Sequence, residues 1–181
     1  FVWLKSVIAD KLFPEGCEDG LISVQGQNYF VQQLQIRQAR TKMEERDLRG
    51  HKYKYYPAFS SSTNDKDANQ TIYGKYLTDL SPLEGFPFGS GNTNNYGSSH
   101  YVTYLDPKDG SENVTAKLQY MEDSGWLDEG TRVIVLDANF YNPTNDMVTA
   151  SRFAIEILPQ GYISSYYYSY TWPRSPHDMT D

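Results

Sequence analysis

The sequence predicts an α+β domain: a mainly antiparallel sheet with helices packed on one face and a long loop or hairpin excursion. Two segments, 1–13 and 113–123, space their apolar residues as helices do, and five others have the alternation or composition of strands. The connections between the last three strands are short, which favours antiparallel pairing. A chain of 181 residues fits one domain, 1–181.

The first helix is predicted over residues 1–13, because an apolar stripe follows helical spacing there and Pro14 and Gly16 stop it. We expect this helix to lie on the sheet. The first strand is predicted over 29–40, as a half-buried strand with alternating faces. The apolar stripe of the helix consists of Trp3, Leu4, Val7, Ile8 and Leu12. The strand has Leu34 and Ile36 on one face and Gln33, Gln35 and Arg37 on the other.

Residues 41–56 are charged and then rich in Tyr, and we expect them to leave the core as an excursion. Two polar or Gly-, Pro- and Asn-rich stretches, 60–70 and 80–97, are predicted to be long loops. Long loops in a compact domain tend to be functional.

A short strand is predicted over 100–105, followed by a second helix that ends near Asp123. The helix is expected to be capped by Ser111 or Asn113 and terminated by Gly125. The apolar face of this helix would consist of Val114, Leu118 and Met121.

Charged residues occupy fixed places in the last part of the chain. Arg152 and Glu156 share one face of a strand, and Arg132 begins the strand before it. A cross-strand pair among them would help to fix the register, and nothing marks these residues as catalytic. The last three strands are predicted over 132–141, 149–158 and 162–172. In the first of them, Val133 and Val135 are expected on one face, and the other face would carry Ile134, Leu136, Ala138 and Phe140.

The formal net charge of -7 argues against a general nucleic-acid-binding protein, which usually has a basic surface. Charge is unevenly distributed, because residues 37–54 hold seven basic and three acidic residues and are therefore +4. We call this segment the basic pole, and it would suit self-association or the binding of a charged partner. A solvated loop with local ion pairs is the alternative interpretation. Within the basic pole, the bases and aromatics of 52–56 fit a protein contact better than single-stranded nucleic acid.

Cys17 is the only cysteine, so neither an intrachain disulfide nor a cysteine-based zinc site can form. A single cysteine favours a reducing compartment, whereas the two sequons at Asn69 and Asn113 favour a secretory route with N-glycosylation. No apolar run is long enough to cross a bilayer. Because the chain starts at Phe1, we expect a domain taken from a longer protein.

Enzymatic chemistry has no clear signal. The three histidines are far apart and match no metal-binding spacing, and no nucleophile elbow, phosphate loop or dinucleotide fingerprint occurs. Residues 106–112 form an acidic turn whose carboxylates miss the alternate positions of a calcium loop. We therefore predict no enzyme, no cofactor and no metal site.

Several blocks together resemble the extracytosolic polycystin domain, also called the TOP domain, of the polycystin (TRPP) channel family, and most resemble polycystin-2-type members. The blocks are 34–40 and 47–49, the turn Trp126-Leu-Asp-Glu-Gly130-Thr-Arg132, and 140–142 followed by Arg152, Glu156, Pro159 and Gly161. The resemblance follows the order of the chain and is weak between 60 and 97.

This resemblance implies a subunit of a TRP-type cation channel, in which the domain forms a tetrameric lid above the pore and regulates gating. Its excursion would contact a neighbouring subunit, and a basic segment would suit an acidic neighbour. The parent would lie in a ciliary, plasma or endoplasmic reticulum membrane with this domain on the extracytosolic side. Residues expected at the subunit contact are Arg46, Arg49, Lys52, Tyr53, Tyr55 and Tyr56.

The expected partners are neighbouring copies in a homotetramer, a polycystin-1-like subunit or extracellular ciliary proteins, and nucleic acid is not among them. Family members often have a disulfide in the excursion, whereas residues 40–60 hold no cysteine here. Two other functions stay open: the equivalent domain of a polycystin-1-like receptor, and a secreted adhesion or glycan-binding module that uses the Tyr-rich surface.

Overall fold

The computed structural model describes residues 1–13, 23–24, 27–78 and 96–174. The loop predicted at 80–97 lies outside these ranges except for Tyr96 and Gly97. Among the described residues, no helix is long and apolar enough to span a bilayer.

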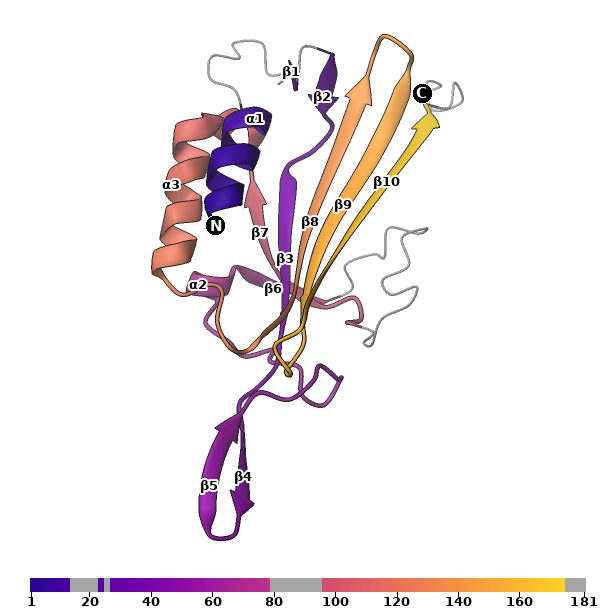
Figure 1. Ribbon diagram of the computed structural model, residues 1–181. Coiled ribbons are helices and arrows are strands. Elements are labelled where there is room, and N and C mark those ends of the chain that lie inside the picture. The colour runs from indigo at the N-terminus through magenta and orange to yellow at the C-terminus, as the bar shows by residue number, and fades with distance from the viewer. Residues whose placement is uncertain (14–22, 25–26, 79–95, 175–181) are drawn as a thin grey trace.

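An eight-stranded antiparallel sheet forms the centre of the domain (Figure 1). Six strands follow the order β1-β2-β8-β3-β7-β6, and β9 and β10 extend the sheet from the other edge of β8. A separate hairpin of β4 (Glu44–Leu48) and β5 (His51–Tyr55) projects from one end. The strands of the main sheet are β1 (Ser23–Val24), β2 (Asn28–Phe30), β3 (Leu34–Arg40), β6 (Lys75–Leu77), β7 (His100–Leu105), β8 (Thr131–Asn142), β9 (Met147–Ile157) and β10 (Ile163–Pro173).

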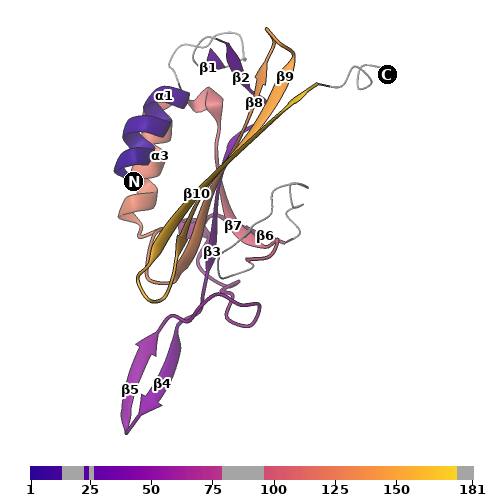
Figure 2. The same ribbon diagram turned by 45° about the vertical axis from the view of Figure 1, so that its right-hand side comes forward.

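The longer helices pack together on one face of this sheet (Figure 2), so the predicted α+β architecture is confirmed. The N-terminal helix consists of a π-helical segment, η1 (Leu4–Ala9), that continues into α1 (Asp10–Leu12). The second long helix is α3 (Gly110–Asp123), which follows the short turn η2 (Pro107–Asp109). A further short helix, α2 (Gln70–Tyr73), leads into β6.

The N-terminal helix has the predicted extent but buries a different stripe. Trp3 and Val7 are 44% and 40% exposed, whereas Ala9 and Phe13 are fully buried. A π-helix advances by i→i+5 bonds rather than i→i+4, so the face it presents rotates away from the spacing of an α-helix. The predicted stripe is therefore correct only for Leu4, Ile8 and Leu12, which pack against the core.

Helix α3 buries Val114, Leu118 and Met121, as predicted, and ends before Gly125 at a φ of +72°. The predicted caps at Ser111 and Asn113 are wrong, because the helix already begins at Gly110. The side-chain amide of Asn113 instead donates to the carbonyl of Asp109 one turn earlier, at 2.8 Å.

The sheet has a core on each face. On the helix face, Ile134 and Leu136 of β8 pack with Ile36 and with the helices, as the predicted alternation requires. On the opposite face, Val133 and Val135 pack in a smaller cluster that includes Phe59, Tyr96, Ala39, Ala154 and Tyr166. Strand β3 is consequently buried on both faces from Ile36 to Arg40, rather than half-buried as predicted, because packed side chains cover both sides of the sheet there.

Candidate functional site at the projecting hairpin

The excursion predicted over 41–56 is a regular two-stranded hairpin that stands away from the rest of the domain (Figures 1 and 2). Every residue of β4 and β5 is exposed. The strands are joined by Arg49 and Gly50, whose φ angles of +58° and +82° are those of the tight turn that fits the twist of a hairpin. The backbone N–H of Gly50 donates to the Asp47 carboxylate at 2.8 Å and holds this turn closed.

Pairing of the strands sorts the side chains of the hairpin into two different faces. Glu45 lies opposite Lys54, and Asp47 opposite Lys52, so one face carries two oppositely charged pairs. We call this the charged face. The other, which we call the aromatic face, carries Glu44, Arg46, Leu48, His51, Tyr53 and Tyr55.

The aromatic face is open to solvent. Leu48, Tyr53 and Tyr55 are 50%, 52% and 39% exposed, and the Tyr55 hydroxyl donates to the Glu44 carboxylate at 2.6 Å. A lone two-stranded hairpin is only marginally stable in water, because it has no third strand and no core. A hairpin of this kind is suited to docking against another surface.

Arg132 fixes the chain where it leaves the hairpin. Its guanidinium donates to the carbonyls of Tyr56 at 2.7 Å and Pro57 at 2.9 Å, and also to those of Glu129 and Thr131. The residue is only 3% exposed, and burial lowers the pKa of its guanidinium. A guanidinium has five N–H donors, so one arginine side chain can bond several backbone carbonyls that have no partner in the sheet.

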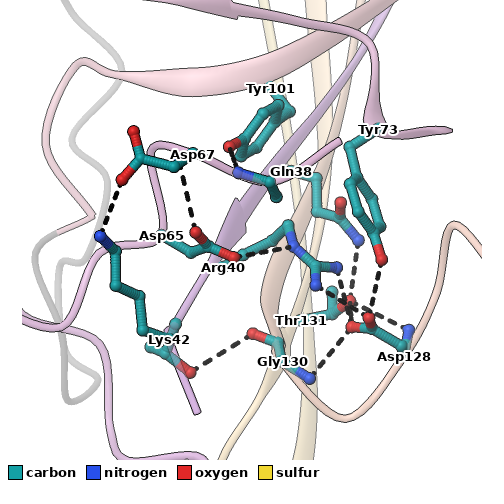
Figure 3. A network of polar contacts seen from close by, with 12 residues as sticks. Gln38, Arg40, Lys42, Asp65, Asp67, Tyr73, Tyr101, Asp128, Gly130 and Thr131 are labelled. Atoms are coloured by element: carbon teal, nitrogen blue, oxygen red, sulfur yellow. Dashed lines mark hydrogen bonds and ion pairs between the residues drawn. The ribbon is translucent and has the colours of Figure 1, made fainter. Parts of the chain in front are cut away.

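A second arginine fixes the chain where it enters the hairpin (Figure 3). Arg40 at the end of β3 forms two parallel bonds with the Asp128 carboxylate, at 2.7 and 2.8 Å, and its guanidinium lies 3.6 Å from the ring centre of Tyr73. The Tyr73 hydroxyl donates to the same carboxylate at 2.9 Å. Burial opposes ionisation of Asp128, but the bonds from Arg40 and Tyr73 outweigh it, so the pKa of Asp128 is lowered.

The turn before β8 connects these two arginines. Gly130 accepts a bond from the backbone N–H of Thr41 at 2.9 Å, and its own N–H donates to Asp128 at 3.0 Å (Figure 3). A methyl group on Gly130 would lie 3.1 Å from the Thr41 carbonyl and 3.3 Å from the ring of Tyr56, so a larger residue would push on both strands of the root. An alanine here would therefore require its neighbours to shift by a few tenths of an ångström.

Trp126 anchors the same turn in the core. It is 1% exposed, its ring meets the edge of Phe1 at 6.2 Å, and its carbonyl accepts a bond of 2.7 Å from the buried Gln38 amide. The predicted motif Trp126, Gly130 and Arg132 therefore lies at one place, the root of the hairpin. We call this set, with Arg40, Thr41 and Asp128, the hairpin root.

The remaining motif residues lie elsewhere. Pro159 and Gly161 form the turn between β9 and β10, where Gly161 has a φ of +83° and its N–H donates to the Leu158 carbonyl. Arg152 forms an ion pair with Asp137 on the neighbouring strand β8, which Arg37 of β3 also contacts at 2.9 Å. These three side chains are nearly fully buried.

The cross-strand pair predicted among Arg132, Arg152 and Glu156 is wrong, because Arg152 pairs instead with Asp137, a residue that the sequence did not single out. Register places Arg152 opposite Asp137, and Glu156 opposite Val133. Glu156 accepts a bond of 2.6 Å from the Tyr96 hydroxyl, and Arg132 belongs to the hairpin root. Alternation in 132–141 places Asp137 on the same face as Val133 and Val135, and only the register with β9 brings it opposite Arg152.

The basic pole predicted for 37–54 is weaker than the sequence suggests. Arg37 and Arg40 are buried in ion pairs with Asp137 and Asp128, and neither side chain reaches the hairpin surface. Strands β4 and β5 with their turn carry four basic and three acidic residues, so the hairpin itself is only +1. An electrostatic contact is thus less favoured than an aromatic one.

His100 is buried on the face of the sheet opposite the helices, at 2% exposure. Burial, reinforced by the nearby charge of Arg37, lowers the pKa of His100 to about 4. Its imidazole is therefore neutral at physiological pH. No group of three or more His, Cys, Asp or Glu residues that could hold a metal ion occurs among the described residues.

The two sequons differ in their surroundings. Asn69 is exposed and precedes α2, where its side-chain oxygen accepts the Thr71 N–H at 3.0 Å; among the described residues its amide nitrogen makes no hydrogen bond. Asn113 is also exposed but lies in the first turn of α3, where its amide nitrogen donates to Asp109. Geometry favours Asn69 as the acceptor of a glycan.

The profile of the Polycystin domain matches residues 3–170 of this chain. The chain belongs to the polycystin domain family. It is similar to the polycystin family receptor for egg jelly of mouse, 32% identical over 75 residues, and of human, 28% over 78 residues. It is also 29% identical over 135 residues to zebrafish polycystin-2.

The match with this chain spans only a small part of the length of those relatives. The match covers 41% of this chain and 4% of the mouse receptor, and 72% of this chain and 14% of zebrafish polycystin-2. Family membership confirms the resemblance based on the motifs of the hairpin root and the final strands.

Proposed function

We propose that this polycystin domain is the extracytosolic lid of a polycystin-2-like cation channel, and that the β4–β5 hairpin is its contact with a neighbouring subunit. The observation that carries the proposal is the contrast between the two ends of the hairpin. Its root is fixed by Arg40, Arg132 and Asp128, whereas every residue of its two strands is exposed. A firmly held arm with an exposed aromatic face is a docking element rather than a loose loop.

The proposed contact uses three of the predicted residues together. Arg46, Tyr53 and Tyr55 share the aromatic face with Leu48, whereas Lys52 lies on the charged face and Arg49 in the turn. Tyr56 lies beside the hairpin root, where its backbone carbonyl accepts a hydrogen bond from the Arg132 guanidinium. Interfaces draw much of their energy from Tyr and Arg, while Lys is depleted, which favours the aromatic face.

The proposal includes assembly as a homotetramer, regulation of gating, and residence in a ciliary, plasma or endoplasmic reticulum membrane. It also includes the absence of catalysis and a glycan at Asn69. The longer match to zebrafish polycystin-2 supports a channel subunit over a receptor. A polycystin-1-like receptor is the second candidate, favoured by the higher identity to the mouse receptor.

Sequencing the parent coding region on both sides of this chain tests the proposal. One membrane span before Phe1 and about five after Asp181 would support the channel lid and lead to current recording. A large amino-terminal ectodomain with a much longer array of spans would favour the receptor. A coding region without any span would overturn both and favour a secreted adhesion or glycan-binding module.

A further inference from the structure

Strand β10 is an edge strand that lacks, up to Trp172, the features that usually protect one. In the described part of the chain it pairs with β9 alone, in unbroken register over eleven residues. Edge strands of natural proteins usually carry charges, prolines or bulges, which prevent pairing with another chain. Residues 163–172 contain no charge and no proline, Pro173 ends the strand, and 169–172 are exposed throughout.

The side chains of β10 alternate between two kinds of row. Tyr166, Tyr168, Tyr170 and Trp172 share the face opposite the helices, because they lie across from Ala154, Arg152, Ala150 and Val148. Tyr170 and Trp172 are 62% and 37% exposed, and their ring centres are 5.5 Å apart. The other face carries mostly hydroxyl groups, from Ser165, Tyr167, Ser169 and Thr171.

The hairpin has the same two-row character. Its aromatic face carries Leu48, Tyr53 and Tyr55, and its charged face offers Lys and carboxylate groups that hydroxyl groups can hydrogen-bond. A strand of the hairpin laid along β10 would match aromatic with aromatic and charged with hydroxyl. No like charges would meet, because β10 has none.

We propose that the exposed part of β10, residues 169–172, receives the β4–β5 hairpin of a second copy of this chain by strand addition. The inference rests on the proposed role of the hairpin as a subunit contact and names the surface that accepts it. Addition would give the hairpin the third strand that a marginal two-stranded sheet needs, and would cover the unprotected edge.

Hairpin and acceptor lie at opposite ends of the molecule (Figure 1), so they meet only between copies. Each copy gives one hairpin and receives another, which makes the contact heterologous. Repetition of such a contact closes a ring when the rotation between copies permits it. This is consistent with a subunit ring.

Disulfide trapping in the full-length protein tests the pairing. Two differently tagged forms are co-expressed, both with Cys17→Ser, one with Lys52→Cys on the charged face and the other with Ser169→Cys on the hydroxyl face. Asp47→Cys and Thr171→Cys are added as further partners, because the experiment must also find which strand of the hairpin pairs with β10 and in which register. Side chains across paired strands lie close enough for a disulfide.

We expect at least one hairpin–β10 pair to cross-link tenfold more than a matched control with Ala116→Cys on the exposed side of α3. Thr171→Lys, which adds an edge charge, should lower that cross-link at least fivefold while the protein stays folded. Cross-linking of Ser169→Cys with itself alone would overturn the proposal in favour of edge-to-edge pairing. Co-purification of the two tags without any hairpin–β10 cross-link would also overturn it but leave the proposed subunit assembly intact, whereas loss of co-purification would overturn both.

Discussion

Arg40 and Asp128 meet in two parallel hydrogen bonds of 2.7 and 2.8 Å, although they are 88 positions apart in the sequence. Their pairing joins the strand that enters the hairpin to the turn that begins β8. The Arg40 side chain is 5% exposed and that of Asp128 is 33% exposed, so solvent screens this ion pair mainly at the carboxylate. The hairpin is thus oriented by a contact that lies outside it.

Removing this pair should loosen the whole hairpin root. We expect Asp128→Asn to lower the free energy of unfolding by about 1–2 kcal/mol, a partly exposed pair being worth less than a buried one. Because the pKa of Asp128 is lowered in the folded state, the stabilisation is present above its unfolded value and lost as pH falls through the folded one. Urea unfolding at pH 7 and pH 3 measures both effects, with the exposed neighbour Glu129→Ala as control. An equal loss at both pH values would contradict the role of the carboxylate charge.

Arg132 should hold the hairpin in position more than it stabilises the core. Arg132→Lys keeps the charge but cannot reach all four carbonyls, so we expect amide exchange in residues 44–57 to accelerate at least tenfold. Exchange in β8 and β9 should change much less. Lys42→Ala, which breaks an exposed ion pair with Asp67, is the matched control and should alter little. Uniform acceleration over the sheet would instead indicate a role in global stability.

Buried His100 should make the domain less stable in mild acid. Its pKa is lowered to about 4 in the folded state, so between pH 6.5 and 4 the unfolded chain binds more protons and stability falls with pH. We expect a loss of about 2 kcal/mol from pH 7 to pH 5 that His100→Gln largely removes. His51→Gln on the exposed hairpin is the control and should retain the loss. An unchanged pH slope in His100→Gln would assign the effect to other groups.

Asn69 should carry a glycan when the chain passes through the secretory pathway. Asn69→Asp removes the acceptor nitrogen but keeps an oxygen to cap α2, so any change reflects the glycan and not the helix. We expect this variant to migrate faster on gels by one glycan and to lose one step of deglycosylation. Thr71→Ser preserves the sequon and should behave as the unmodified sequence. Unaltered migration of Asn69→Asp would show that the sequon is unused.

Local patterns predicted the elements well, and contacts distant in sequence explain what they missed. The alternation of residues 132–141 predicted strand β8 and the face on which Ile134 and Leu136 lie, because the period of two of a strand can be read from neighbouring residues. The partners of Arg40 and Arg132 depend on which turn lies beside which strand, and no local period contains that information. Asp128 therefore passed unnoticed inside a motif that was otherwise recognised.

The same limit applies to the hairpin. The charged and Tyr-rich composition of 41–56 predicted an excursion, but not its two faces, which follow from the turn at Arg49 and Gly50. Counting charge along the sequence overstated the basic pole, because burial of Arg37 and Arg40 is a tertiary feature. The π-helical turn at Leu4–Ala9 likewise cannot be distinguished by spacing from an α-helix.

The most direct test of the proposed subunit contact compares the two faces of the hairpin in the full-length protein. Leu48→Ser with Tyr53→Ser alters the aromatic face, and Lys52→Ser with Lys54→Ser alters the charged face of the same hairpin. Oligomer size is measured by light scattering after purification in detergent. We predict that the aromatic-face pair lowers the tetramer fraction at least fivefold and that the charged-face pair changes it less than twofold. Tetramers of undiminished abundance in the aromatic-face variant would contradict the account.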